Sequence, residues 1–196
     1  MAEVSLDLGK TAILMGDFYE DMILNLSHAV ERKVLEKAQT VLKAARDAGI
    51  LVCYSATVFR PGYPEISDRN KIFRQRKTSG QPAAGDPLKL IHPSLRPAEG
   101  EIVVGKHRVN ALYGTGLDVV LRANDIETLI ITGYATGGVV LSTARFAADL
   151  DYRLLVVEDC CWDSDPEVHD FLTQRILPRQ ADVITSEELI RALGGS

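Results

Sequence analysis

Apolar residues along the chain form short unbroken runs, separated by stretches in which they recur every three or four positions. The short runs are typical of strands that are buried on both faces, and the longer spacing is typical of amphipathic helices. We predict six strands, at Thr11–Gly16, Ile50–Ala56, Ile102–Gly105, Thr128–Thr132, Arg153–Glu158 and Asp182–Thr185. Strands that alternate with helices indicate a mostly parallel sheet with helices on both faces. The predicted fold class is therefore α/β, with a doubly wound six-stranded sheet.

The helical stretches carry start and stop signals. The longest follows the first strand, with Ser27 as its expected N-cap and Gly49 as its stop. Further helices are predicted at Gly116–Asn124, Gly138–Leu150, Pro166–Leu177 and Ser186–Leu193. Thr185 and Glu188 fit a capping box at the start of the last helix.

The segment from Val58 to Gly100 lacks this alternation and holds six of the eight prolines. We expect an excursion over the sheet that serves as a lid or an interface element. Its first part is basic, with Arg60, Arg69, Lys71, Arg74, Arg76 and Lys77 offset by Glu65 and Asp68. This charge could attract a carboxylate substrate, or the segment could be a solvated loop or a subunit contact.

Composition and charge narrow the classes of function. The chain has 196 residues, 46% of them hydrophobic, as expected for a single globular domain over residues 1–196. The net charge of -5 offers no basic excess for nucleic acid, and no apolar stretch approaches the roughly 20 residues that span a membrane. The start of the chain has no signal-peptide pattern. We expect a cytoplasmic protein that acts on a small molecule, with neither nucleic acid nor membrane as a partner.

Cysteine and histidine positions give no sign of a metal or a disulfide framework. Cys53, Cys160 and Cys161 are odd in number and contain an adjacent pair, which fits a reducing compartment. The four histidines lack the short spacing of metal ligands. We therefore predict no metal and no cofactor.

Three elements at strand ends could carry chemistry, because ligands of parallel sheets bind beyond the carboxyl ends of the strands. Asp17 follows the first strand, where it could act as an acid or base or could simply cap a turn. Lys106 follows the third, where it could hold an anion and tune the pKa of a carboxylate or could be solvated. Gly133–Gly138 links a strand to a helix, so its N–H groups could bind an oxyanion, or the glycines could only make the connection tight.

Taken together, these elements resemble the isochorismatase-like (cysteine hydrolase) superfamily. The resemblance rests on Ala12 to Asp21, on Gly105-Lys106 with Ala111 to Leu117, and on Thr132 to Ala144 continuing to Asp159. It covers nearly the whole chain in the right order. It implies a hydrolase with a Rossmann-like three-layer fold in which Asp17 and Lys106 are catalytic, and we expect a homo-oligomer, a dimer or a tetramer.

The resemblance also identifies a departure from the family's chemistry. The position of the family's nucleophilic cysteine is occupied by Val139, which cannot be a nucleophile. A glutamine that is common in the family is replaced by Tyr19, and Tyr54 to Thr57 stand where nicotinamidase-like members bind a metal. The resemblance further implies a cis peptide between Tyr134 and Ala135 and oxyanion donors at the N–H groups of Ala135 and Val139. We expect the substrate to contact these residues: Tyr19, Tyr134, Ala135, Gly138 and Val139.

Three functions follow from this pattern. The first is hydrolysis of a small anionic molecule, for example a vinyl ether, with Asp17 as the general acid. The second is hydrolysis of a small amide by water that Asp17 activates, and the third is a non-catalytic binding or oligomeric role. A general acid must be protonated, and Lys106 would lower the pKa of Asp17 whereas apolar Val139 would raise it. The sequence leaves open which effect prevails.

Overall fold

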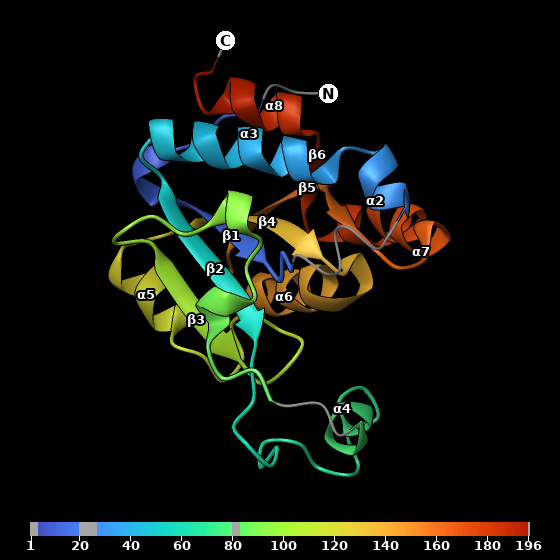
Figure 1. Cartoon of the computed structure of the whole chain (residues 1–196). Coiled ribbons are helices and arrows are strands. Elements are labelled where there is room, and N and C mark those ends of the chain that lie inside the picture. Colours follow the sequence, from blue (N-terminus) through green and yellow to red (C-terminus); the bar gives the residue numbers. More distant parts are fainter. Residues whose placement is uncertain (1–3, 20–26, 80–82, 196) are drawn as a thin grey trace.

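The computed structural model describes residues 4–19, 27–79 and 83–195. Its centre is a sheet of six strands in the order β3-β2-β1-β4-β5-β6, in which every pair of neighbours is parallel (Figure 1). The strands are β1 Thr11–Gly16, β2 Leu51–Thr57, β3 Ile102–Lys106, β4 Thr128–Tyr134, β5 Arg153–Trp162 and β6 Asp182–Ile184. The predicted α/β class and the number of strands are confirmed. The strand order reverses between β1 and β4, which is where ligands bind in such sheets.

Helices cover both faces of the sheet. They are α2 Ser27–Glu31, α3 Val34–Asp47, α4 Arg74–Thr78, α5 Leu117–Ala123, α6 Leu141–Ala148, α7 Pro166–Phe171 and α8 Ser186–Ala192. Figure 1 shows α3 and α8 on one side of the sheet and α5 and α6 on the other. Side chains alternate along a strand, so β1 sends Ile13 and Met15 into the first core and Ala12 and Leu14 into the second. This explains the unbroken apolar run in β1.

Two predicted helices are shorter than expected. The stretch that begins at Ser27 forms two helices, because Lys33 adopts a left-handed conformation (φ 55°) and ends the hydrogen-bonding pattern of α2. The helix predicted at Pro166–Leu177 ends at Phe171 and continues as a π-helical turn. In contrast, the capping box of α8 is present as predicted. None of the helices in the described ranges is long and apolar enough to cross a membrane.

The excursion after β2 carries α4 away from the sheet (Figure 1). It has a small core of its own around Phe59, Tyr63 and Ile66. On its way back it meets the segment that follows β1, where Ile91 pairs with Tyr19 in an isolated antiparallel bridge. The excursion is therefore attached at the carboxyl edge of the sheet.

Candidate active site

Asp17 stands directly after β1 in a strained conformation. Its φ is 54°, a region that favours glycine, and its N–H donates to the carbonyl of Ser55 at 2.9 Å. Next to it, Gly16 pairs with Gly133 of β4. A Cβ on Gly133 would lie 1.9 Å from the carbonyl oxygen of Gly16, so only glycine fits there. This close approach brings the turn after β4 beside the carboxylate.

Lys106 is buried and its ammonium group is surrounded by acceptors. Nζ lies 2.7 Å from Oδ2 of Asp17, 2.6 Å from Oγ1 of Thr57 and 3.2 Å from the carbonyl oxygen of Arg108. An ammonium group has three N–H donors, so each has a partner within the protein. Lys106 therefore holds Asp17 and has no donor left over for a substrate.

Tyr19 contacts the same carboxylate from the other side. Its hydroxyl donates to Oδ1 of Asp17 at 2.9 Å and accepts a hydrogen bond from the N–H of Thr57. The sequence predicted Tyr19 as a substrate contact. Its ring lines the cavity, but its hydroxyl is bound to the protein.

Burial determines the direction in which the pKa values of Asp17 and Lys106 are shifted. It raises the pKa of Asp17 above its ordinary value, and hydrogen bonds from Lys106, Tyr19 and Thr57 oppose the rise. Burial likewise lowers the pKa of Lys106, while the charge of Asp17 opposes the fall. The question that the sequence left open is answered, since burial prevails over the lysine. A carboxyl group with a raised pKa is suited to proton transfer.

The turn after β4 has the form that the resemblance implied. The peptide bond between Tyr134 and Ala135 is cis, and residues 136–140 form a kinked turn in which Gly138 is not helical (φ -100°, ψ -109°). Three of its N–H groups are already used: those of Gly138 and Val140 donate to the carbonyl of Ala135 at 2.9 and 3.3 Å, and that of Gly137 donates to Oδ2 of Asp163 at 2.7 Å. The N–H groups of Ala135 and Val139 stay the predicted oxyanion donors.

These groups share one cavity of about 340 Å³. Its lining includes every residue that the sequence selected: Asp17, Tyr19, Lys106, Tyr134, Ala135, Gly138 and Val139. The expected meeting of three distant segments at one edge of the sheet is therefore observed. Which of these residues act in catalysis stays a prediction.

Comparison with known proteins identifies the family. The family model described as the isochorismatase domain matches residues 11–188. The chain belongs to the isochorismatase family. Maleamate amidohydrolase from Pseudomonas putida is 27% identical over 187 residues, which are 94% of this chain and 87% of the relative. N-carbamoylsarcosine amidase from an Arthrobacter species is 28% identical, and ureidoacrylate amidohydrolase from Klebsiella pneumoniae is 34% identical.

The last two matches cover 82% and 69% of this chain but only 61% and 62% of those relatives. Among solved structures similar to this chain, N-carbamoylsarcosine amidase from Thermoplasma acidophilum has a TM-score of 0.72 at 30% identity, over 91% of this chain and 97% of its own. A cysteine hydrolase from Pseudomonas syringae has a TM-score of 0.86 at 21% identity, over 97% and 95% of the two chains. The second likeness supports the fold alone.

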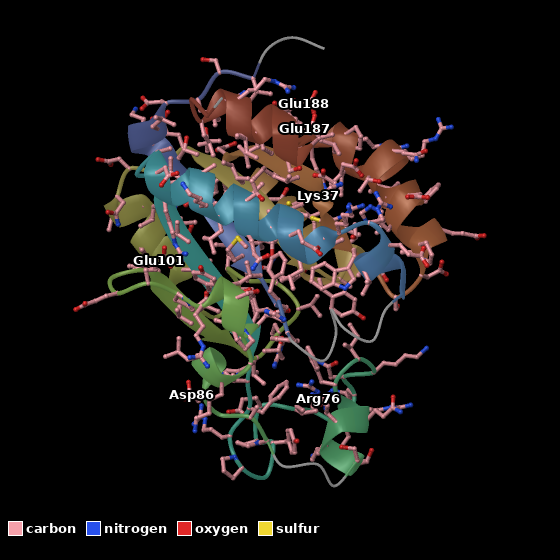
Figure 2. The ribbon with its side chains drawn as sticks, turned by 45° about the horizontal axis from the view of Figure 1, so that its top comes forward. Lys37, Arg76, Asp86, Glu101, Glu187 and Glu188 are labelled. Carbon is pink, nitrogen blue, oxygen red and sulfur yellow. The ribbon has the colours of Figure 1, made fainter. Side chains whose placement is uncertain are left out.

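Sequence reasoning missed two polar residues of the cavity. Thr57 is the last residue of β2, so the rule that selected Asp17 at the end of β1 would also have found it. Arg76 lies on α4, where only the general basic charge of the excursion pointed to it. Figure 2 shows Arg76 between α4 and the body of the molecule.

None of the three cysteines is part of the lining of this cavity. Cys53 is buried in β2, and Cys160 and Cys161 are buried in β5. Burial raises the pKa of Cys53 to about 12 and also raises the pKa values of the other two. Over residues 4–19, 27–79 and 83–195, no three histidine, cysteine or acidic side chains are grouped to hold a metal ion.

Proposed function

We propose that this member of the isochorismatase family hydrolyses the carbon–nitrogen bond of a small, carboxylate-bearing amide or ureido compound. The observation that carries the proposal is the buried carboxylate of Asp17, which is held by Lys106 and Tyr19 beside the turn after β4. The names of the three relatives describe amide-cleaving enzymes, which supports this choice of bond.

The proposed reaction uses water as the nucleophile. Asp17 takes a proton from water, and the hydroxide forms a bond to the carbonyl carbon. The carbonyl oxygen becomes an oxyanion, which the N–H groups of Ala135 and Val139 stabilise. Asp17 then gives the proton to the leaving nitrogen, the carbon–nitrogen bond breaks, and a carboxylic acid and an amine are released.

The proposed reaction uses no thiol as the nucleophile, and the reason is Val139. Val139 lines the cavity where the family resemblance places the nucleophilic cysteine, and its side chain lies against Gly16. A valine has no group that can attack a carbonyl carbon. The three cysteines of the chain do not replace it, because they are buried outside the cavity lining.

Charge in the cavity supports an anionic substrate. Asp17 and Lys106 neutralise one another, which leaves the guanidinium group of Arg76 as the remaining charged group that the described residues contribute to the lining. An arginine can bind a carboxylate with two parallel hydrogen bonds. We therefore place the carboxylate of the substrate near α4 and the bond to be cleaved near Asp17.

Vinyl-ether hydrolysis is the second candidate, and the raised pKa of Asp17 favours it. A protonated Asp17 would deliver its proton to the vinyl carbon, and water would capture the resulting oxocarbenium ion. No covalent bond to the protein forms in either reaction.

The test is a panel of small carboxylated amides, ureido acids and vinyl ethers, with release of ammonia or of pyruvate as the readout. We expect turnover with an amide or a ureido acid. Pyruvate release alone would favour the second candidate. Binding without turnover, unchanged in Asp17→Asn, would support the non-catalytic role instead.

A further inference from the structure

We propose that Tyr19 is a positioning residue, which fixes the orientation and the ionisation of Asp17, and that the excursion holds Tyr19 in place. The inference rests on the acid–base role proposed for Asp17. It deepens that role by naming the group that controls the carboxylate on the side opposite Lys106.

Thr57 and Asp17 together determine the direction of the Tyr19 hydroxyl. The N–H of Thr57 donates to the phenolic oxygen, and this N–H belongs to the backbone of β2 and cannot turn away. The single proton of the hydroxyl then points to Oδ1 of Asp17, 2.9 Å away. Tyr19 is thus a donor to Asp17 in a fixed direction.

The two oxygens of Asp17 receive different donors. Oδ1 accepts from the neutral hydroxyl of Tyr19, and Oδ2 accepts from the charged ammonium group of Lys106 at 2.7 Å. Two donors on opposite oxygens fix the plane of the carboxylate. Each oxygen has a second lone pair, so the group can still accept a hydrogen bond from a water molecule.

Tyr19 stays protonated while Asp17 exchanges protons. Burial raises the pKa of Tyr19 well above its ordinary value, and the negative charge of Asp17 raises it further. The hydroxyl therefore remains a donor and does not compete with Asp17 for a proton. A donor to the ionised form favours that form, so Tyr19 opposes the effect of burial on Asp17.

The backbone beside Tyr19 is held from two directions. The returning excursion pairs Ile91 with Tyr19, and the N–H of His92 donates to the carbonyl of Phe18 at 2.8 Å. On the other side, the ring of Phe18 packs on Trp162 of β5 with a centroid distance of 5.2 Å. The excursion therefore reaches the proposed catalytic carboxylate through main-chain contacts, in addition to the side chains of Ile72, Phe73 and Arg76 that line the cavity.

The experiment is Tyr19→Phe, with a carbon-13 NMR titration of the Asp17 carboxyl group and steady-state kinetics. We expect the carboxyl midpoint to move to higher pH, because its neutral donor is gone. We expect kcat to fall about tenfold or more with little change in KM, as for loss of a hydrogen bond to a charged group. Tyr152→Phe is the matched control, since it removes a hydrogen bond of 3.2 Å to Asp118 outside the cavity lining. It should change neither result.

An unchanged midpoint, or a change confined to KM, would overturn the proposal and make Tyr19 a substrate contact. If Tyr19→Phe does not fold, site-specific 3-fluorotyrosine at position 19 gives the opposite test. Fluorine makes the hydroxyl a stronger donor at nearly the same size, so the midpoint should move to lower pH. The titration needs no substrate, so it can fail or succeed independently of the proposed amide hydrolysis.

Discussion

Asp17 is the residue on which the proposed chemistry depends. Asp17→Asn keeps the size of the side chain but removes its capacity to exchange a proton, so we expect a folded protein with turnover lower by a factor on the order of a hundred or more. Steady-state kinetics and circular dichroism would test this. Asp47→Asn is a suitable control, because Asp47 is exposed on α3 and pairs with the exposed Lys43 one helix turn away. Full activity of Asp17→Asn would exclude Asp17 from the mechanism.

The direction of the pH dependence separates the two reactions that Asp17 could perform. As a base, Asp17 must be ionised, so kcat/KM should rise as the pH increases through the pKa of Asp17. As an acid, Asp17 must be protonated, so kcat/KM should fall over the same range. Burial raises this pKa, so the midpoint should lie above the ordinary value of 3.8 in either case. A pH profile of kcat/KM provides the measurement. We expect the rising form, and a falling profile would favour vinyl-ether hydrolysis.

Alkylation tests the proposal that no thiol takes part. The thiolate is the reactive form, and burial raises the pKa of Cys53 to about 12. Iodoacetamide should therefore leave the activity of the folded protein unchanged. Mass spectrometry should show little labelling of Cys53, Cys160 and Cys161. Activity that is lost in proportion to the labelling of one of them would give that cysteine a role.

At the scale of the residue, the sequence predicts which side chains meet but not how they bond. Asp17 and Lys106 could be found because each follows a recognisable strand. The use of all three Lys106 donors by Asp17, Thr57 and Arg108 could not be found, because it depends on ångström-scale packing of three separate segments. The same holds for Tyr19, which was predicted as a substrate contact and not as a hydrogen-bond donor to Asp17.

At the scale of the element, α4 connects the excursion to substrate recognition. Arg76→Gln removes a guanidinium group that lines the cavity and is not paired with Asp17, so KM for a carboxylated substrate should rise about tenfold or more. KM for the uncharged amide analogue should change much less. Arg74→Gln is the matched control on the same helix, because Arg74 is exposed and is not part of the cavity lining. Equal effects of the two variants would indicate general attraction by charge.

The strands were easier to predict than the helices for a physical reason. A strand that is buried on both faces must be apolar throughout, so its run is visible, and β1 was predicted with its correct bounds. The break between α2 and α3 has no such signal, because Lys33 adopts a left-handed conformation that lysine rarely takes. Short helices of the excursion, such as α4, have too few residues for a periodic pattern.

At the scale of the whole molecule, the site follows from the order of the strands. Parallel strands bring their carboxyl ends to one edge, and the reversal between β1 and β4 places Asp17 beside the turn at Ala135. This is why a site assembled from distant segments could be predicted at all. The path of the excursion could not, because it depends on contacts such as the bridge between Tyr19 and Ile91.

The buried ion pair links this site to the stability of the fold. Lys106→Met removes one partner and leaves the carboxylate of Asp17 buried without its counter-charge, which typically costs about 3–5 kcal/mol. In Asp17→Asn/Lys106→Met both charges are gone while the volumes are kept. We expect its free energy of unfolding to return to the wild-type value or to exceed it by about 1–4 kcal/mol.

The stability of Lys106→Met should also depend on pH, and the direction of that dependence identifies the buried charge as the cause. Without Lys106, the pKa of Asp17 in the folded protein rises further above its unfolded value, so the folded state of Lys106→Met binds a proton more tightly. Its stability should therefore be best preserved at low pH and should fall as the pH rises through the folded pKa. Urea unfolding of wild type and both variants at pH 5 and pH 8 would measure this. A double variant as unstable as Lys106→Met at both pH values would show that the buried charge is not the cause, and that Lys106 stabilises the fold through its hydrogen bonds to Thr57 and Arg108.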